Sequence, residues 1–173
     1  MNKNTKKLGL LGLSLVTLLL YSSGWTAENG KNTWHNFDNG LAKAEKEHKT
    51  VLVDFYADWC HWCKVMDEKT FQDAAVAKKL QERFVTVKLN AEDNSGVVHY
   101  KSQQYTNPQL TQAFGVNGFP SLAFIDSNGE VITLIPGYVE ADMFLQILNY
   151  IDDRCWEKNV SFDDYVKNQD CSS

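Results

Sequence analysis

The feature that most constrains the fold is an apolar run that leads directly into two closely spaced cysteines. Residues 51–56, Val-Leu-Val-Asp-Phe-Tyr, are nearly all apolar, and Cys60-His61-Trp62-Cys63 follows shortly after them. Such runs are typical of central strands that are covered on both faces. We interpret residues 60–66 as the start of a helix. The sequence therefore predicts a buried strand, a turn and a helix that begins at Cys60.

The spacing of Cys60 and Cys63 favours thiol–disulfide chemistry. Two intervening residues let both sulfurs meet within one helical turn, and the first sulfur then lies over the free N–H groups of the helix start. Those dipoles stabilise a thiolate. We therefore expect Cys60 to attack a substrate disulfide and Cys63 to resolve the mixed disulfide that forms.

A structural disulfide and half of a zinc site are the alternatives for this pair. Zinc requires four ligands in a structural site. The other two cysteines, Cys155 and Cys171, do not form a second C-x-x-C motif, and the chain contains no H-x₃-H pair. The position on a strand-to-helix turn favours redox chemistry over both alternatives.

Periodicity along the rest of the chain predicts further strands and helices in alternation. We expect strands at 84–89, 121–125 and 131–135, the last two forming a hairpin, and helices at about 38–48, 70–82, 107–115, 140–153 and a short one after Ser161. A strand, helix and strand in this order form a right-handed parallel crossover. The predicted fold class is α/β, with a central mixed sheet and helices on both faces.

Some details of these elements are expectations for particular residues. Asp38 or Asn39 is the expected cap of the first helix, and Asn107 that of the helix beginning at Pro108. Residues 90–106 are expected to be irregular because they are polar. Ala42 and Met143 are assigned to the inward stripes of their helices.

The N-terminal residues have the three-part order of a secretory signal peptide. Three lysines lie within the first seven residues, an apolar run covers 8–21, and small residues follow. Cleavage after Gly24 fits the local pattern better than cleavage after Ala27, and an uncleaved anchor is the alternative. The predicted organisation is a signal peptide at 1–24, a main domain at 25–153 and a C-terminal extension at 154–173.

Export and charge limit the partners that this chain can have. The formal net charge is −5, and removal of residues 1–24 with their three lysines makes it −8. An acidic surface argues against nucleic acid as a partner. All four cysteines lie in the exported part, where disulfides persist. Four cysteines allow two bridges and three pairings.

Three segments of the chain resemble the thioredoxin superfamily. Residues 51–64 look like its active-site strand and turn, 87–90 like the next strand, and 116–121 like the loop that presents a cis-proline. The resemblance runs from about Trp34 to about Tyr150 and implies the thioredoxin fold. Within the superfamily, the chain looks most like periplasmic SoxW-type proteins and the C-terminal domain of the reductase DsbD.

The resemblance assigns roles to a carboxylate and a lysine. Asp54 interrupts the apolar strand, and a buried carboxylate is costly without a partner or a task. Similarity to thioredoxins implies that Asp54 accepts a proton from Cys63 and that Lys88 tunes it. The alternative is a solvated Asp54 that faces an edge.

The resemblance also implies a substrate-binding surface around the cysteines. A cis bond between Phe119 and Pro120 would leave the preceding carbonyl free to bind a substrate backbone like an added strand. The alternative is an ordinary trans proline at the entrance of a strand. Trp59 and Trp62 are expected to form an apolar rim that receives partners, together with Phe119.

The dipeptide His61-Trp62 departs from the Gly-Pro of thioredoxins, so the direction of electron flow stays open. A protonated His61 beside Cys60 would favour the thiolate and make the protein more oxidising. The alternative is an exposed His61 that only shapes the docking surface.

Cys155 and Cys171 flank the last predicted helix. We expect a structural disulfide between them that pins the tail to the long helix before it. A second redox pair that relays electrons to Cys60 and Cys63 is the alternative. Neither cysteine has the helix-start setting that activates a thiol.

These observations predict an enzyme that exchanges disulfides with exported proteins in the periplasm. We expect a monomeric reductase fed by a membrane electron donor, with no organic cofactor and no metal; a dithiol oxidase is the rival. A second class is a non-catalytic metallochaperone, whose histidine ligand would have to be one of four. These are His35, His48, His61 and His99.

Overall fold

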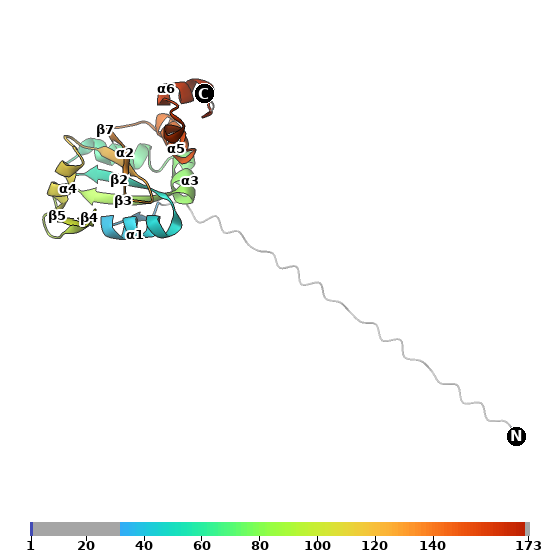
Figure 1. Cartoon of the computed structure of the whole chain (residues 1–173), viewed down its shortest axis with the longest axis horizontal. Helices are drawn as coiled ribbons and strands as arrows, with labels where there is room; N and C mark the ends of the chain where they lie inside the picture. Colours follow the sequence, from blue (N-terminus) through green and yellow to red (C-terminus); the bar gives the residue numbers. More distant parts are fainter. Residues whose placement is uncertain (2–31, 172–173) are drawn as a thin grey trace.

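A computed structural model describes Met1 and residues 32–171 (Figure 1). The expected signal peptide and its two cleavage sites lie outside the described residues. The strands are β1 (Trp34–His35), β2 (Thr50–Tyr56), β3 (Phe84–Asn90), β4 (Val98–Tyr100), β5 (Gln103–Tyr105), β6 (Ser121–Ile125) and β7 (Val131–Pro136). The helices are α1 (Phe37–Glu47), α2 (His61–Lys69), α3 (Ala74–Arg83), α4 (Asn107–Ala113), α5 (Ala141–Asp152), the 3₁₀ helix η1 (Cys155–Lys158) and α6 (Phe162–Asn168).

Five strands form one mixed sheet in the order β1-β3-β2-β6-β7. Strand β3 is parallel to both β1 and β2, whereas β6 is antiparallel to both β2 and β7. The predicted strand–helix–strand crossover and the predicted hairpin are therefore confirmed. Strand β2 lies at the centre of the sheet, as its apolar composition indicated.

Side chains of β2 alternate between the two faces of the sheet. Val51, Val53 and Phe55 pack in one core with residues of α1 and α4. Leu52 packs on the opposite face in a second core with residues of α2, α3 and α5. Figure 1 shows helices on both sides of the sheet, as predicted. This alternation turns Asp54 toward the face that α2 covers.

Helix α1 differs from the prediction at its start and on its buried face. Its N-cap is Asn36, whose side chain accepts the N–H of Asn39, so the expected caps Asp38 and Asn39 are wrong. Ala42 is exposed, and Gly40 is buried instead. A Cβ atom at Gly40 would collide with Val87 of β3. The backbone of α1 therefore lies directly on the sheet, an approach that a glycine allows.

Residues 90–106 are not entirely irregular, because β4 and β5 form a small antiparallel hairpin there. The Asp38 carboxylate accepts the backbone N–H of His99 at 2.8 Å and lies 2.7 Å from its ring Nδ1. The Tyr100 hydroxyl donates to the Gly129 carbonyl at 2.8 Å. These contacts reach residues distant in the chain, so local polarity could not predict the hairpin.

Two further expectations for helices are wrong in detail. Thr106, rather than Asn107, caps α4, and it forms a reciprocal capping box with Gln109. Met143 is 43% exposed, so it lies outside the buried stripe of α5. Ser161 caps α6 and accepts the backbone N–H of Asp164, as predicted.

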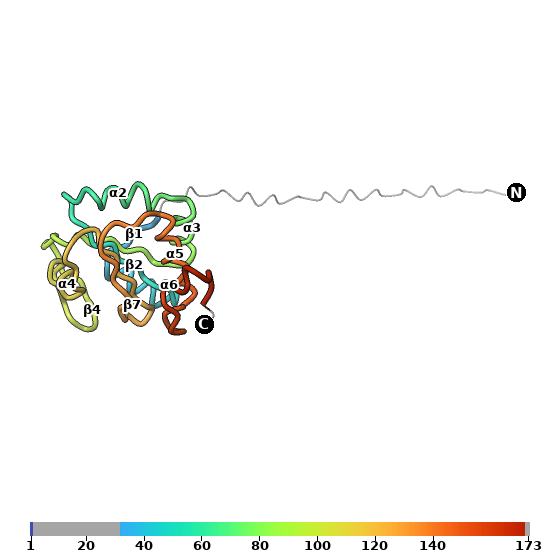
Figure 2. Tube along the Cα trace, turned by 90° about the horizontal axis from the view of Figure 1, so that it is seen from above, coloured from blue at the N-terminus to red at the C-terminus, as the bar shows by residue number. Residues whose placement is uncertain are grey.

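The C-terminal extension packs on the end of α5. Tyr150 of α5 lies 5.5 Å, between ring centroids, from both Phe162 and Tyr165. Its hydroxyl donates to the Val160 carbonyl at 2.8 Å. Both views place α6 on the side of the molecule away from α4 (Figures 1 and 2). Within residues 32–171, none of the helices has the length and apolar character that crossing a membrane requires.

Candidate active site

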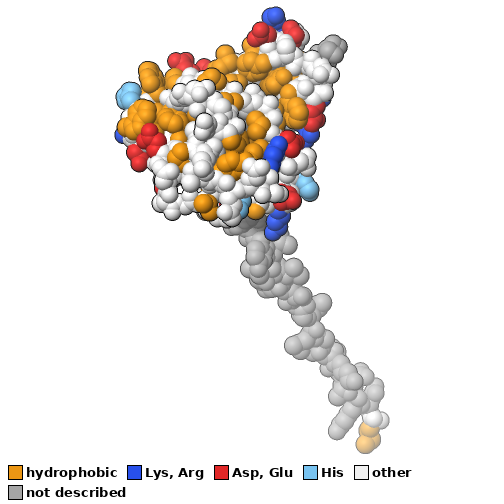
Figure 3. All heavy atoms as spheres, turned by 60° about the vertical axis from the view of Figure 1, so that its left-hand side comes forward, with side chains coloured by type: hydrophobic (Ala, Val, Ile, Leu, Met, Phe, Trp, Pro, Cys, Tyr) orange, Lys and Arg blue, Asp and Glu red, His pale blue; other side chains and the backbone are white. Residues whose placement is uncertain are grey.

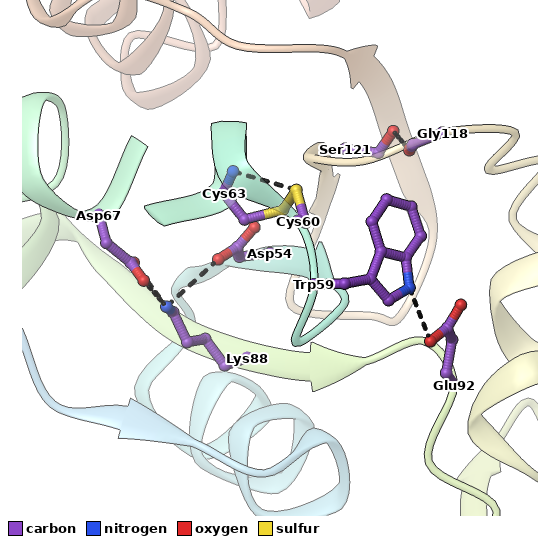
Figure 4. Close-up of a disulfide and its surroundings, with 9 residues drawn as sticks. All are labelled: Asp54, Trp59, Cys60, Cys63, Asp67, Lys88, Glu92, Gly118 and Ser121. Atoms are coloured by element: carbon purple, nitrogen blue, oxygen red, sulfur yellow. Dashed lines mark hydrogen bonds and ion pairs between the residues drawn. A yellow bond between two sulfur atoms is a disulfide. The ribbon is translucent and has the colours of Figure 1, made fainter. Parts of the chain in front are cut away.

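Cys60 and Cys63 lie at the start of α2, the helix that follows β2, and a disulfide joins them (Figure 4). Their Cα atoms are 5.3 Å apart. Cys60 is the N-cap of α2, and its Sγ accepts the backbone N–H of Cys63 at 3.0 Å. The sulfur therefore occupies the position in which helix-start N–H groups stabilise negative charge. Both cysteines are buried.

Asp54 lies below the disulfide, between it and Lys88 (Figure 4). It is 2% exposed, so the alternative of a solvated Asp54 is wrong. Its Oδ2 is 3.7 Å from Lys88 Nζ, whereas its buried Oδ1 has no hydrogen-bond partner among the described residues. Burial raises the pKa of the Asp54 carboxyl to about 7, against the opposing effect of the Lys88 charge. A carboxyl with this pKa can exchange a proton near neutral pH.

Asp67 is a member of this cluster that the sequence did not point to. Its two carboxylate oxygens accept from Lys88 Nζ at 2.5 and 2.6 Å, shorter than the distance from Lys88 to Asp54. One lysine therefore serves two carboxylates. Asp67 follows Cys63 by four residues on α2, so the shared helix face was the available signal.

The bond between Phe119 and Pro120 is cis, and it lies at the start of β6. The Pro120 carbonyl accepts the N–H of Gly137, and the Ser121 hydroxyl donates to the Gly118 carbonyl; both distances are 2.8 Å. The backbone N–H and C=O of Phe119 have no partner among the described residues. Both groups can therefore pair with an extended chain laid beside them.

Aromatic side chains surround the two cysteines. Trp59 is 68% exposed and Trp62 is 54% exposed. The Trp59 ring lies 6.1 Å from that of Phe119, and its Nε1 donates to Glu92 at 2.9 Å. The Trp62 ring lies 5.3 Å from that of Tyr138. We call Trp59, Trp62, Phe119 and Tyr138 the aromatic rim.

Exposure distinguishes His61 from the cysteines on either side of it. His61 is the first residue of α2 and is exposed beside Trp62, with ring centroids 5.7 Å apart.

Figure 3 brings the α4 side of the molecule forward and shows hydrophobic patches there, with charged side chains mostly near the edges. Sequence analysis missed Glu92 and did not assign Tyr138 to the rim, because both are distant from the cysteines along the chain.

The second disulfide joins Cys155 to Cys171, with Cα atoms 5.1 Å apart. Cys155 is fully buried at the start of η1 and packs with Val160 and Tyr165. The side chains packed around this bridge are apolar or aromatic. Within residues 32–171, histidines, cysteines and carboxylates form no group of three or more that could hold a metal ion.

A family model and known proteins match this chain. The profile of the family described as thioredoxin-like domain matches residues 37–152. The thiol:disulfide interchange protein DsbD of Actinobacillus pleuropneumoniae serotype 5b is 36% identical over 105 residues, which cover 60% of this chain and 16% of the relative. DsbD of Photorhabdus laumondii is 32% identical over 122 residues, covering 69% and 19%.

A solved structure gives the same result for the fold. The solution structure of a thioredoxin from Thermus thermophilus has a TM-score of 0.58 at 22% identity, and the match covers 69% of this chain and 86% of that one. The chain spans less than a fifth of the length of the two DsbD relatives. The predicted thioredoxin fold and the predicted resemblance to DsbD are confirmed, while the SoxW-type likeness stays a prediction.

Proposed function

Because the chain belongs to the thioredoxin-like family, we propose that it is a thiol–disulfide oxidoreductase whose reactive pair is Cys60 and Cys63. One observation carries the proposal: the disulfide joins a helix N-cap to the next turn, directly above a buried carboxyl. A purely structural bridge needs neither the helix start nor the carboxyl. The names of the DsbD relatives support this class of reaction.

The exchange proceeds in two steps from the reduced protein. The Cys60 thiolate attacks one sulfur of a substrate disulfide, a mixed disulfide forms, and the other substrate sulfur leaves as a thiolate. Cys63 then attacks the Cys60 sulfur and releases the second substrate thiolate. The substrate disulfide is reduced by two electrons, and the protein ends with the Cys60–Cys63 disulfide that the structure contains.

Asp54 serves the second step as a proton acceptor. Cys63 must lose its proton to attack, and the unpaired Oδ1 of Asp54 faces the disulfide (Figure 4). A pKa of about 7 lets Asp54 take this proton near neutral pH and release it again after the exchange. Lys88 stabilises the ionised Asp54, and Asp67 limits how much positive charge Lys88 offers.

The aromatic rim and the backbone of Phe119 bind the partner. The free backbone groups of Phe119 pair with an extended segment of the substrate, while Trp59 and Trp62 provide exposed apolar surface on both sides of Cys60. His61 and Pro120 complete this surface. The exposed aromatic side chains and the free backbone groups suit a protein disulfide or dithiol as partner.

The proposal also includes the direction of electron flow and the cellular location of the protein. We place the protein in the periplasm, as a monomeric reductase of exported proteins that receives its electrons from a membrane donor. The signal-like start of the sequence and the similarity to DsbD support this assignment. A potential of the Cys60–Cys63 couple near that of thioredoxin, about −270 mV, is expected; a value near about −120 mV would identify an oxidase instead. Equilibration with glutathione measures it.

Trapping of partners tests the assignment of the two cysteines. With Cys63→Ser, the mixed disulfide through Cys60 cannot be resolved and should accumulate on a substrate protein that contains a disulfide. With Cys60→Ser, no such adduct should form. Non-reducing gels followed by mass spectrometry of the adduct give the readout. Equal trapping by both variants would refute the assigned order of attack.

A further inference from the structure

The Lys88 ammonium lies between two aromatic rings as well as between two carboxylates. Its Nζ is 5.1 Å from the ring centroid of Trp34 and 5.3 Å from that of Tyr56. A cation within about 6 Å of an aromatic ring centroid, over its face, is attracted by the ring quadrupole. The rings come from β1 and β2, the strands on either side of β3, which carries Lys88.

Contacts with β3 and with the turn between α2 and α3 fix Trp34 in this place. Strand β1 pairs with β3, where Trp34 is the partner of Thr86. The Trp34 ring meets that of Phe71 edge-on, with centroids 5.0 Å apart. Just before it, Asn32 donates to the Phe71 carbonyl at 3.0 Å, and the Thr33 carbonyl accepts from Thr86 at 2.8 Å. The Trp34 ring is therefore held in place beside the Lys88 ammonium.

We propose that Trp34 is a positioning residue of the redox site. With Tyr56, it holds the Lys88 ammonium between Asp67 and Asp54, within reach of the carboxyl that serves Cys63. Lysine has a flexible stem, and the side chain of Lys88 is 24% exposed. Without the Trp34 ring, the ammonium would follow Asp67, which it binds through both oxygens, toward solvent. This inference rests on the proposed function.

The direction of the effect follows from the charges near Asp54. Lys88 on β3 opposes the rise that burial causes in the pKa of Asp54, whereas Asp67 on α2 adds to it. Burial raises the pKa of the Tyr56 hydroxyl, and the nearby charge of Asp58 adds to this rise. Release of Lys88 therefore moves the ionisation of Asp54, and with it the resolving step, to higher pH.

The test follows both steps separately in the full-length reduced protein. Dithiobis(nitrobenzoate) releases one coloured thiolate when Cys60 forms the mixed disulfide and a second when Cys63 closes the Cys60–Cys63 bond. For Trp34→Leu, we expect the acid limb of the second phase to move up by about half to one pH unit, so that this phase slows by about 3- to 10-fold below the limb. The first phase should not change.

Control variants separate positioning from damage to the fold. Trp34→Phe keeps a weaker ring and should shift the limb by less; if Trp34→Leu does not fold, this smaller shift carries the test. Trp156→Leu, a change in η1 on the C-terminal extension, should leave both phases unchanged. In a Lys88→Met background, Trp34→Leu should produce no further shift.

Two results would overturn the inference. One is an unchanged acid limb in folded Trp34→Leu and Trp34→Phe. The other is an equal shift with and without Lys88, which would show that Trp34 acts on the fold rather than through the lysine. Failure of the proposed function would look different, because the wild type would then lack the second phase altogether.

Discussion

The two disulfides join cysteines whose surroundings differ in kind. Cys60 and Cys63 are three residues apart at a helix start, and the buried carboxyl of Asp54 lies beneath them. Cys155 and Cys171 are 16 residues apart, and they pack with apolar and aromatic side chains of the C-terminal extension. At the first pair, a backbone N–H donates to the Cys60 sulfur and a buried carboxyl can accept a proton. Among the described residues, no backbone N–H donates to either sulfur of the second pair.

This difference separates exchange chemistry from anchoring. A disulfide opens readily when the sulfur that leaves is stabilised and the attacking sulfur can be deprotonated. A disulfide that closes a longer loop stabilises the fold by restricting the unfolded chain. We therefore propose that the Cys155–Cys171 bridge anchors the tail. Four experiments test this contrast.

The largest effect is expected from loss of the attacking sulfur. Cys60→Ser should abolish reduction of a protein disulfide, because no other thiolate occupies a helix start beside the aromatic rim. Cys155→Ser/Cys171→Ser should retain a rate close to that of the wild type. Turnover of a model disulfide substrate, with a chemical reductant in excess, measures both. Loss of activity in Cys155→Ser/Cys171→Ser would instead indicate that the second pair relays electrons to the first.

Replacement of the buried carboxyl should act on both stability and rate. Because the folded-state pKa of Asp54 is raised from 3.8 to about 7, the folded protein keeps a proton in this window that the unfolded chain has lost. Stability therefore falls as pH rises from about 4 to about 7 and is lowest above that. Asp54→Asn removes this loss. Its free energy of unfolding should therefore exceed that of the wild type by at most about 4 kcal/mol at neutral pH, and the two should be equal below about pH 4.

Denaturant unfolding of the oxidised protein across this pH range checks the sign. In the same variant, release of the mixed disulfide should slow more than its formation, since the proton acceptor for Cys63 is missing. A stability difference between the wild type and Asp54→Asn that does not depend on pH would contradict the raised pKa. Unchanged single-turnover kinetics would remove Asp54 from the mechanism.

The bridge in the tail should contribute to stability alone. Cys155→Ser/Cys171→Ser is expected to lower the free energy of unfolding by up to about 3 kcal/mol, the amount that a loop of this size gives in the chain-entropy model. Thermal unfolding with and without reductant measures the change. Equal stability would indicate that the packing of Tyr165 on Tyr150 is sufficient to hold the tail. Peptide mapping of the oxidised protein should recover the Cys155–Cys171 peptide.

The smallest effect is expected from Asp67. Asp67→Asn frees Lys88 to approach Asp54 and removes a negative charge that raises the pKa of Asp54. The acid limb of the resolving step should therefore move to lower pH, opposite to the shift expected for Lys88→Met. Glu68→Gln, one residue further along the same helix, is the matched control. A shift to higher pH for Asp67→Asn would show that Asp67 holds Lys88 in place rather than competing for it.

Local sequence patterns were sufficient to predict most of the strands and helices. The apolar run of β2, the motif at Cys60 and the turn before β7 depend on residues that are close in the chain. Helical spacing was also sufficient to predict a helix at about 70–82, and α3 buries Val76, Ala77 and Leu80 along one stripe. Periodicity gives the direction of a helix face but not its width, which explains why Met143 was assigned to the core.

Contacts between distant residues account for what the sequence did not show. Strand β1 has only two residues, so it has no period, and its pairing with β3 defines it. The bond between Lys88 and Asp67 joins residues 21 apart on different elements. Asp54 and Lys88 were placed together through resemblance to thioredoxins, and the register of β2 on β3 makes them direct partners.

The alternation along β2 also determines where the chain can tolerate a change in length. One inserted or deleted residue between Thr50 and Val53 would turn Val53 and Asp54 to each other's faces, because side chains alternate with a period of two. A single insertion or deletion would therefore remove Val53 from its core and Asp54 from its place below the disulfide. The exposed turn at residues 92–97 borders the same site but carries no such alternation, so insertions there should be accepted. Natural variation in length near this active site is therefore expected after β3 and not before α2.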